Sequence, residues 1–213
     1  MKLKKIGISL RVETIEKYDE RRDTISHDWI NFLQKLNFVP ILIPNNLQDT
    51  EGYISELKLD GIILSGGDNL GEFPERDETE NRILEAAIKN SMPILGVCRG
   101  MQKINQYFGG TYETLSTSEH VGKEHLIDIK QEKFSTLFQS KTIKVNSFHY
   151  NIITKDTVGD NLIPFAFSKN DGTVEGFYHS KLPIIGVMWH PERDMISKHQ
   201  TKLMEVFENK SLW

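Results

Sequence analysis

The sequence predicts an α/β fold in which a mostly parallel central sheet, with a few antiparallel strands, is flanked by helices. Short apolar runs at residues 62–64, 93–97 and 183–189 suit strands that are buried on both faces. Segments with apolar residues at helical spacing lie between several of these runs. The runs end in glycines and polar residues, and open parallel sheets bind ligands at the carboxyl ends of their strands. These three observations favour a doubly wound sheet with one crevice.

The length and composition favour a single domain in a reducing compartment. The chain has 213 residues, so we expect residues 1–213 to form one domain with a sizeable core. The single cysteine, Cys98, excludes an intrachain disulfide and favours a reducing, cytoplasmic location. No apolar run approaches a membrane span, and the first residues do not resemble a secretory signal. The formal net charge is −4 with dispersed basic residues, so no nucleic-acid partner is expected. The sequence does not define an oligomeric state.

In the first half of the chain, predicted strands alternate with predicted helices. The polar stretch from Glu13 is expected to be a loop that leads into a helix over 26–36, which carries an apolar stripe. Trp29 in this stripe is expected to belong to the core. The expected strands are 5–10, 39–44, 59–64 and 93–97. The other expected helices are 45–57, 76–89 and the segment directly after Cys98.

The second half is expected to add antiparallel strands and a terminal helix. Residues 120–125 are expected to be an irregular polar segment, and 126–138 with 141–145 to form short antiparallel strands and a turn. Asp171-Gly172 indicates a hairpin between two further strands. Those strands are 162–169 and 174–178. The last predicted elements are a strand over 183–189 and a helix over 196–207.

The segment Gly96-Val97-Cys98-Arg99-Gly100 predicts a nucleophile elbow, a sharp turn between a strand and a helix. Cysteine stands where hydrolases with this turn carry serine. Larger side chains at Gly96 or Gly100 would collide with the neighbouring strand or helix. Unpaired N–H groups at the start of the helix would stabilise a thiolate and a developing oxyanion. The alternative is that Cys98 is a small buried apolar residue.

Two other predicted strand ends carry residues that complement this cysteine. Residues 65–68, Ser-Gly-Gly-Asp, follow a buried strand, and the glycines let backbone N–H groups approach a ligand, although a plain tight turn is the alternative. His190 and Glu192 follow the last strand, and a carboxylate beside an imidazole fixes its tautomer. Because such strand ends face one crevice, we expect Cys98, His190 and Glu192 to lie together.

Other polar residues are candidates for ligand contact, each with a simpler alternative. Arg11 follows the first strand, as a site residue or as a solvated surface charge. Arg76 is placed to bind a substrate carboxylate, or to accompany the acidic residues that begin a helix. His120 and His125 could bind a metal, but no cysteine or further histidine stands at a matching spacing, so no metal is predicted.

Three segments resemble, in order, the signature segments of the class I glutamine amidotransferase-like hydrolases. They are IILSGG at 62–67, GVCRGMQ at 96–102 and GVMWHPE at 186–192. This resemblance spans nearly the whole chain and implies a flavodoxin-like three-layer fold. It also implies that Cys98 is the nucleophile, His190 the general base and then acid, and Glu192 its orienting partner. The backbone N–H groups of Gly67 and Arg99 would form the oxyanion hole.

Within this family, two further segments resemble the stand-alone γ-glutamyl amide hydrolases, which release glutamate and an amine to water. These segments are Arg76-Asp77 and residues 146–149. The resemblance implies that Gln102 contacts the glutamyl group, and it implies no cofactor. The other substrate-binding residues that it implies are Arg76, Asn146, Ser147, Phe148 and His149.

Residues 27–29 and 120–125 resemble the family members that hydrolyse γ-glutamyl-CDP-amidate in capsule phosphoramidate assembly. The implied products are glutamate and cytidine diphosphoramidate. Cationic side chains would then meet the phosphates. The candidates are Lys123, His125, Arg11 and Arg193. The alternatives are a hydrolase of small amines such as γ-glutamyl-γ-aminobutyrate, a glutaminase subunit that feeds ammonia to a synthetase, and a non-catalytic binding module.

Overall fold

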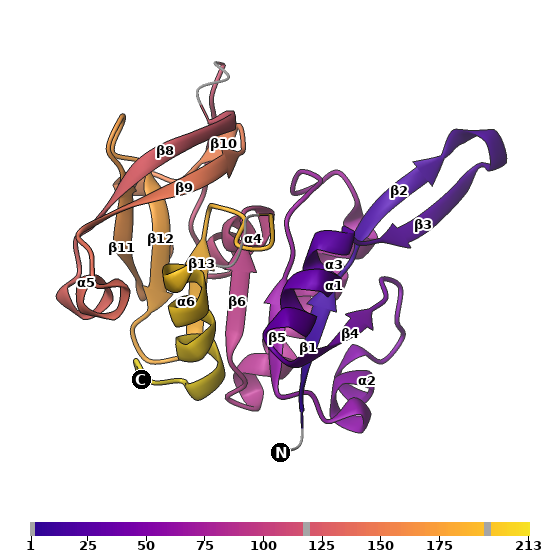
Figure 1. Ribbon diagram of the computed structural model, residues 1–213. Coiled ribbons are helices and arrows are strands. Elements are labelled where there is room, and N and C mark those ends of the chain that lie inside the picture. The colour runs from indigo at the N-terminus through magenta and orange to yellow at the C-terminus, as the bar shows by residue number, and fades with distance from the viewer. Residues whose placement is uncertain (1–2, 117–119, 194–196) are drawn as a thin grey trace.

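The computed structural model describes residues 3–116, 120–193 and 197–213, and a mixed sheet runs through these residues (Figure 1). In order across the sheet, its strands are β4 (Phe38–Ile43), β1 (Lys4–Ser9), β5 (Gly61–Leu64), β6 (Ile94–Val97), β13 (Ile184–Val187), β12 (Val174–His179), β11 (Leu162–Ser168), β8 (Val121–Ile129) and β9 (Thr142–Phe148). The strands from β4 to β13 are parallel, and those from β12 to β9 run antiparallel to their neighbours. The predicted α/β sheet with some antiparallel strands is confirmed.

Helices flank this sheet, as predicted (Figure 1). They are α1 (His27–Lys35), α2 (Thr50–Leu57), α3 (Pro74–Lys89), α4 (Arg99–Tyr107), α5 (Glu132–Phe138) and α6 (Lys198–Asn209). Helix α2 packs on α3, α3 on α4, and α5 on α6. The first helix begins where Ser26 accepts a hydrogen bond from the Asp28 N–H, and Trp29 packs in the core as expected. The expected start of the last helix, residue 196, lies outside the described residues. No described helix combines the length and the apolar composition needed to cross a membrane.

The expected loop from Glu13 is wrong, because this stretch forms a β-hairpin. Strands β2 (Arg11–Ile15) and β3 (Glu20–Thr24) pair antiparallel around a 3-10 turn, η1 (Glu16–Tyr18). The hairpin projects from the parallel side of the sheet (Figure 1). Its residues are mostly exposed, so it lacks the alternation of apolar and polar residues that identifies a half-buried strand.

Two expectations in the antiparallel half are also wrong. Residues 120–125 are largely part of strand β8, and residues 132–138 form helix α5 where strands were expected. Phe134, Leu137 and Phe138 stand at helical spacing, and Phe134 stacks on Phe165 at a ring distance of 3.8 Å. The hairpin at Asp171-Gly172 joins β11 to β12 as predicted. Smaller elements are β7 (Glu113–Thr114), which pairs with β10 (Asn151–Ile152), and the 3-10 turn η2 (Lys155–Thr157).

The three central parallel strands align the ends that carry the predicted site. Every residue of β5, β6 and β13 is buried, as the apolar runs predict. Leu64 pairs with Gly96, and Val97 pairs with Val187, so the three strands end at one level. The loops that follow these strands therefore open into one crevice.

Candidate active site

Cys98 lies in a strained turn between β6 and α4, as the elbow predicts. Its φ is +51° and its ψ is −106°, a conformation that residues with a side chain rarely adopt. A Cβ on Gly100 would lie 2.0 Å from the carbonyl oxygen of Leu64, and one on Gly96 would lie 2.5 Å from the Cδ1 of Ile104. Close packing on both sides of the turn therefore requires these two glycines.

The turn after β5 brings a second set of backbone groups to the crevice. Gly67 has a φ of +94°, and the side chain of Arg11 lies against it, where a Cβ would be 2.2 Å from the Arg11 Nε. Gly67, Cys98 and Arg99 line the same pocket. The loop after β5 and the first turn of α4 thus flank the thiol, which is the arrangement an oxyanion hole needs.

His190 and Glu192 complete a buried triad with Cys98. The Nδ1 of His190 lies 2.7 Å from the Glu192 Oε1, and both side chains are almost fully buried. Burial lowers the pKa of His190, but the neighbouring Cys98 thiolate and the Glu192 carboxylate outweigh it and raise this pKa to about 9. Near neutral pH the His190 ring is therefore protonated beside the Cys98 sulfur, and an imidazolium in this position favours the reactive form of a cysteine nucleophile.

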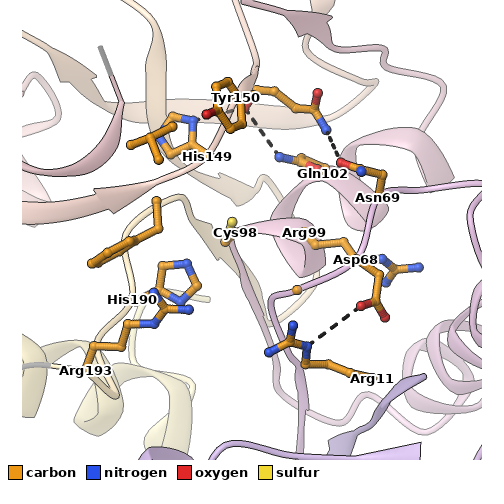
Figure 2. Close-up of a pocket in the computed structure, with 14 residues that line it drawn as sticks. Arg11, Asp68, Asn69, Cys98, Arg99, Gln102, His149, Tyr150, His190 and Arg193 are labelled. Atoms are coloured by element: carbon orange, nitrogen blue, oxygen red, sulfur yellow. Dashed lines mark hydrogen bonds and ion pairs between the residues drawn. The ribbon is translucent and has the colours of Figure 1, made fainter. Parts of the chain in front are cut away.

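Cys98 and His190 line a pocket with a volume of about 340 Å³ (Figure 2). Four of the predicted substrate-binding residues line it, and Arg193 joins them. The Phe148 ring stands edge-on to His190 with ring centres 5.8 Å apart, and the Arg193 guanidinium lies over the Phe148 ring, 4.3 Å from its centre. The four predicted residues are Gln102, Phe148, His149 and Arg11.

Arg76 does not reach the pocket. Its side chain is fully buried and donates to Glu80 and Asp68, at 3.1 and 2.8 Å, and to the carbonyl oxygens of Ser65 and Gly66. The structure therefore corrects the expected substrate contact, because the guanidinium joins the loop after β5 to Glu80 of α3. The alternative, in which the acidic residues only stabilise the start of a helix, is also incomplete, because Glu80 is buried and pairs with Arg76.

Asn146 and Ser147 are also directed into the protein. The Asn146 side chain accepts from the His190 N–H and donates to the His190 carbonyl, each at 2.8 Å. Ser147 donates to the carbonyl of His120 at 2.7 Å and is buried. Neither lines the pocket, so the structure corrects the expected direct substrate contacts. Asn146 instead holds the loop that carries His190, and Ser147 holds the segment at His120.

Of the four cations proposed for phosphates, two line the pocket. Arg11 and Arg193 do so with side chains about one-third exposed, 37% and 36%. Lys123 is exposed on β8 away from the pocket lining, and His125 is buried beside Glu175 at 3.5 Å. The expected phosphate contact of His125 is therefore corrected, and no contact in the described residues supports that of Lys123.

His125 belongs to a buried group of residues whose types suit a metal. The ligand atoms of three of its neighbours, His120, His149 and Glu175, all lie within 4.8 Å of one another. Sequence spacing does not reveal this group, because His149 and Glu175 come from parts of the chain that are distant in sequence.

Pocket residues that the sequence did not single out come mostly from loops. Asp68 bridges Arg11 and Arg76, and the side-chain oxygen of Asn69 accepts from the Asn151 side chain at 3.3 Å. Asp68 follows the Gly-Gly pair directly, and this position at a strand end is the available signal in the sequence. Tyr150 and Val121 also line the pocket.

Comparison with known proteins agrees with this geometry. The peptidase C26 family model matches residues 5–192. The γ-glutamyl-CDP-amidate hydrolase of Campylobacter jejuni is 32% identical, over 89% of this chain and 90% of that protein. A putative glutamine amidotransferase-like protein of Lactococcus lactis is 33% identical, over 85% of this chain and 86% of that protein.

A solved structure shows the same fold. It is that of a putative GMP synthase protein from Thermoplasma acidophilum, with a TM-score of 0.74 and 22% identity, over 98% of this chain and 94% of that chain. The chain therefore belongs to the peptidase C26 family of class I glutamine amidotransferase-like proteins and is a hydrolase that acts on an amide bond.

Proposed function

We propose that this hydrolase cleaves a γ-glutamyl amide through a thioester on Cys98, and that its substrate is γ-glutamyl-CDP-amidate. The observation that carries the proposal is one pocket in which Cys98 and His190 lie near two arginines and two exposed aromatic rings, with Glu192 holding His190 from behind. The triad accounts for the chemistry, and the surrounding cations and rings account for the leaving group.

The first half-reaction forms the thioester. The Cys98 thiolate attacks the γ-carbonyl carbon, and the N–H groups of Gly67 and Arg99 stabilise the oxyanion, each donor contributing about 3–4 kcal/mol. The imidazolium of His190 then donates its proton to the departing nitrogen as the C–N bond breaks. Glu192 holds the Nδ1 side of the ring, so that Nε2 carries the proton that is transferred.

The second half-reaction depends on a change in charge at Cys98. In the thioester the sulfur is no longer negative, so one of the two charges that raise the pKa of His190 is gone, and the ring has already given its proton to the leaving nitrogen. His190 is then neutral and accepts a proton from water as the water oxygen attacks the thioester carbonyl. The proton on His190 and the regenerated thiolate restore the starting ion pair, and glutamate leaves.

The proposed leaving group is a cytidine diphosphoramidate. Arg11 and Arg193 are guanidinium groups suited to its phosphate oxygens. Phe148 and Tyr150 line the same pocket with exposed fractions of 41% and 50%, and exposed rings can stack on a pyrimidine base. The similarity to the Campylobacter jejuni enzyme supports the same substrate.

A substrate panel tests the proposal. The purified protein is incubated with γ-glutamyl-CDP-amidate, γ-glutamyl-γ-aminobutyrate and glutamine, and glutamate release is measured. We expect the highest kcat/KM for the nucleotide amide and no release by Cys98→Ala. A preference for glutamine would favour a glutaminase that supplies ammonia, whereas a preference for the small amine would favour that type of hydrolase. Release from none of the three would contradict the γ-glutamyl assignment itself.

A further inference from the structure

Four buried side chains in the antiparallel half converge on one point that the triad does not use. We call His120, His125, His149 and Glu175 the histidine cluster. His120 directly precedes β8, His125 lies on β8, His149 follows β9, and Glu175 lies on β12. Their exposed fractions are 2%, 7%, 5% and 0%, so all four are withdrawn from water.

In the described part of the chain, the facing atoms of the histidine cluster make no hydrogen bonds, and they meet one another only at ion-pair distances of 3.5 Å or more. Within the described residues, the Nδ1 of His120, the Nε2 of His125 and the Nε2 of His149 make no hydrogen bond, nor does either carboxylate oxygen of Glu175. A buried carboxylate without a hydrogen bond or a cation is strongly unfavourable, because the lost hydration is not replaced. A positive charge among these atoms would offset this cost.

The distances from Glu175 to the three imidazoles are close to those between ligands of one metal ion. The Glu175 Oε1 lies 3.8 Å from the His120 Nδ1, 3.5 Å from the His125 Nε2 and 3.7 Å from the His149 Nε2. Four ligands at about 2.0–2.2 Å around tetrahedral Zn²⁺ are separated by about 3.3–3.6 Å. The ligand atoms of His120, His149 and Glu175 lie within 4.8 Å of one another, so these three side chains would have to approach by up to about 1 Å. His125 lies outside this group and would have to move closer to complete the shell.

Hydrogen bonds behind the imidazoles already orient them for this role. The Nε2 of His120 lies 2.7 Å from the Asp171 Oδ2, and the Nδ1 of His149 lies 3.0 Å from the Asn151 carbonyl oxygen. Asp171 is held in turn by the N–H and the hydroxyl of Thr173. When the outer ring nitrogen carries the proton and donates a hydrogen bond to such an acceptor, the inner nitrogen has a free lone pair for a metal. Metal-binding histidines in proteins are oriented in this way.

We propose that His120, His149 and Glu175, with His125 as the fourth ligand, bind a divalent transition-metal ion for which Zn²⁺ is the probe. Imidazole nitrogens favour Zn²⁺ and its neighbours over Mg²⁺ and Ca²⁺, which take oxygen ligands. With His125 as the fourth ligand the tetrahedral shell would be closed, so the ion would be structural and would take no part in bond breaking.

The bound ion would stabilise one wall of the active-site pocket. His149 lines that pocket, and its backbone N–H donates to the carbonyl of His120 at 3.1 Å. The same segment carries Asn146, which holds His190, and Phe148, which contacts it. Coordination would fasten this segment to β8 and β12. The alternative without metal is an ion pair between Glu175 and a protonated imidazole.

Zinc titration of the metal-stripped protein distinguishes the two states. The measurements use the Cys98→Ala background, because a thiol beside an imidazole can bind Zn²⁺ itself. We expect one equivalent of Zn²⁺ per chain by elemental mass spectrometry, together with a rise in Tm. Adding Glu175→Gln should weaken binding by more than about 100-fold, beyond the roughly 10–100-fold typical of changes behind the ligands. Adding His27→Ala, which removes an exposed histidine elsewhere, should leave binding unchanged.

Three outcomes overturn the proposal. One is that the Cys98→Ala protein takes up no Zn²⁺, and another is that Glu175→Gln binds as tightly as its parent. If Glu175→Gln does not fold, the visible absorption spectrum of Co²⁺ added to the metal-stripped Cys98→Ala protein tests the site instead. Intense visible bands of tetrahedral Co²⁺ support the site, whereas weak octahedral bands or no uptake overturn it.

Discussion

The side chain of Asn146 holds the backbone of His190 from both sides, accepting from its N–H and donating to its carbonyl at 2.8 Å each. Asn146 lies on β9, in the antiparallel half of the sheet, whereas His190 follows β13. This pairing fixes the loop in which the imidazole stands, although Asn146 itself is outside the pocket lining. It makes Asn146 a positioning residue, and this role differs measurably from substrate binding.

Asn146→Ala should lower kcat with little change in KM. A displacement of about 1 Å in a catalytic group typically reduces the rate by about 100-fold. Steady-state kinetics with a γ-glutamyl amide measures the effect, and Asn31→Ala, at an exposed position of α1, is the control. A rise in KM with kcat unchanged would instead assign Asn146 to the substrate.

The pH profile should report the ion pair between Cys98 and His190. Because the pKa of His190 is raised to about 9, the imidazolium is present below that pH and disappears above it. The value of kcat/KM should therefore fall as the pH rises through about 9, since the leaving nitrogen loses its proton donor. An NMR titration of the ring should place the midpoint there. In Cys98→Ala the midpoint should fall, and an unchanged midpoint would show that the thiolate is not the cause.

Glu80→Gln should destabilise the protein by about 3–5 kcal/mol, the usual cost of breaking a buried ion pair. Glu80 is fully buried and pairs with Arg76 and Arg99, thereby linking the two loops that flank the thiol. Glu78→Gln, which breaks an exposed pair with Arg82, should cost less than about 1 kcal/mol. Urea unfolding at neutral pH measures both.

The effect of Glu80→Gln should depend on pH in a defined direction. Burial raises the pKa of Glu80, but Arg99 and Arg76 outweigh it and hold the pKa below its ordinary 4.5. The stabilisation from the charged carboxylate is therefore present above pH 4.5 and lost as the pH falls through the lower pKa of the folded state. The difference between Glu80→Gln and the parent should shrink over that range. A constant difference would mean that charge pairing is not its source.

Gly100→Ala should destabilise the fold by about 3 kcal/mol or more, at or beyond the upper end of overpacking effects, and abolish activity. The new methyl group would lie 2.0 Å from the Leu64 carbonyl oxygen, and backbone cannot move aside cheaply there. Gly109→Ala is the matched control, because its φ is +83° but no atom lies within 4 Å of the new methyl. That change should cost about 1 kcal/mol. Equal costs would show that close packing at the elbow is not limiting.

Arg193→Ala should raise KM for γ-glutamyl-CDP-amidate and leave KM for γ-glutamyl-γ-aminobutyrate nearly unchanged. Loss of a charged hydrogen bond of about 1.5–3 kcal/mol corresponds to about 10–100-fold. Lys123→Ala removes a cation on β8 outside the pocket lining and should alter neither value. An equal rise for both substrates would place Arg193 on the glutamyl side.

The features that sequence could predict are local. Two glycines around a cysteine specify an elbow because the steric conflict lies within a few residues and the strand beside it. Fully apolar runs identify β5, β6 and β13 because both faces of these strands are covered. The strand ends then meet at one edge for topological reasons, and this brings Cys98 and His190 into one pocket.

The features that sequence could not predict depend on distant partners. Arg76 and Asn146 carry the donors that a substrate site needs, but in the structure these donors satisfy backbone carbonyls and buried charges. A buried polar side chain must find a partner, and residue type does not show whether that partner is substrate or protein. The hairpin over residues 11–24 escapes prediction for a different reason, since its exposed strands carry no apolar pattern.

Strand direction changes after β13, and the residues that line the pocket come from both sides of this change. The sulfur and its backbone donors follow parallel strands, whereas Phe148, His149 and Tyr150 come from the antiparallel side. Substitutions in the second group can reshape the space for the departing group while the sulfur and its backbone donors stay on the parallel strands. Related proteins with this sheet can therefore differ in the amine that they release while they break the amide bond in the same way.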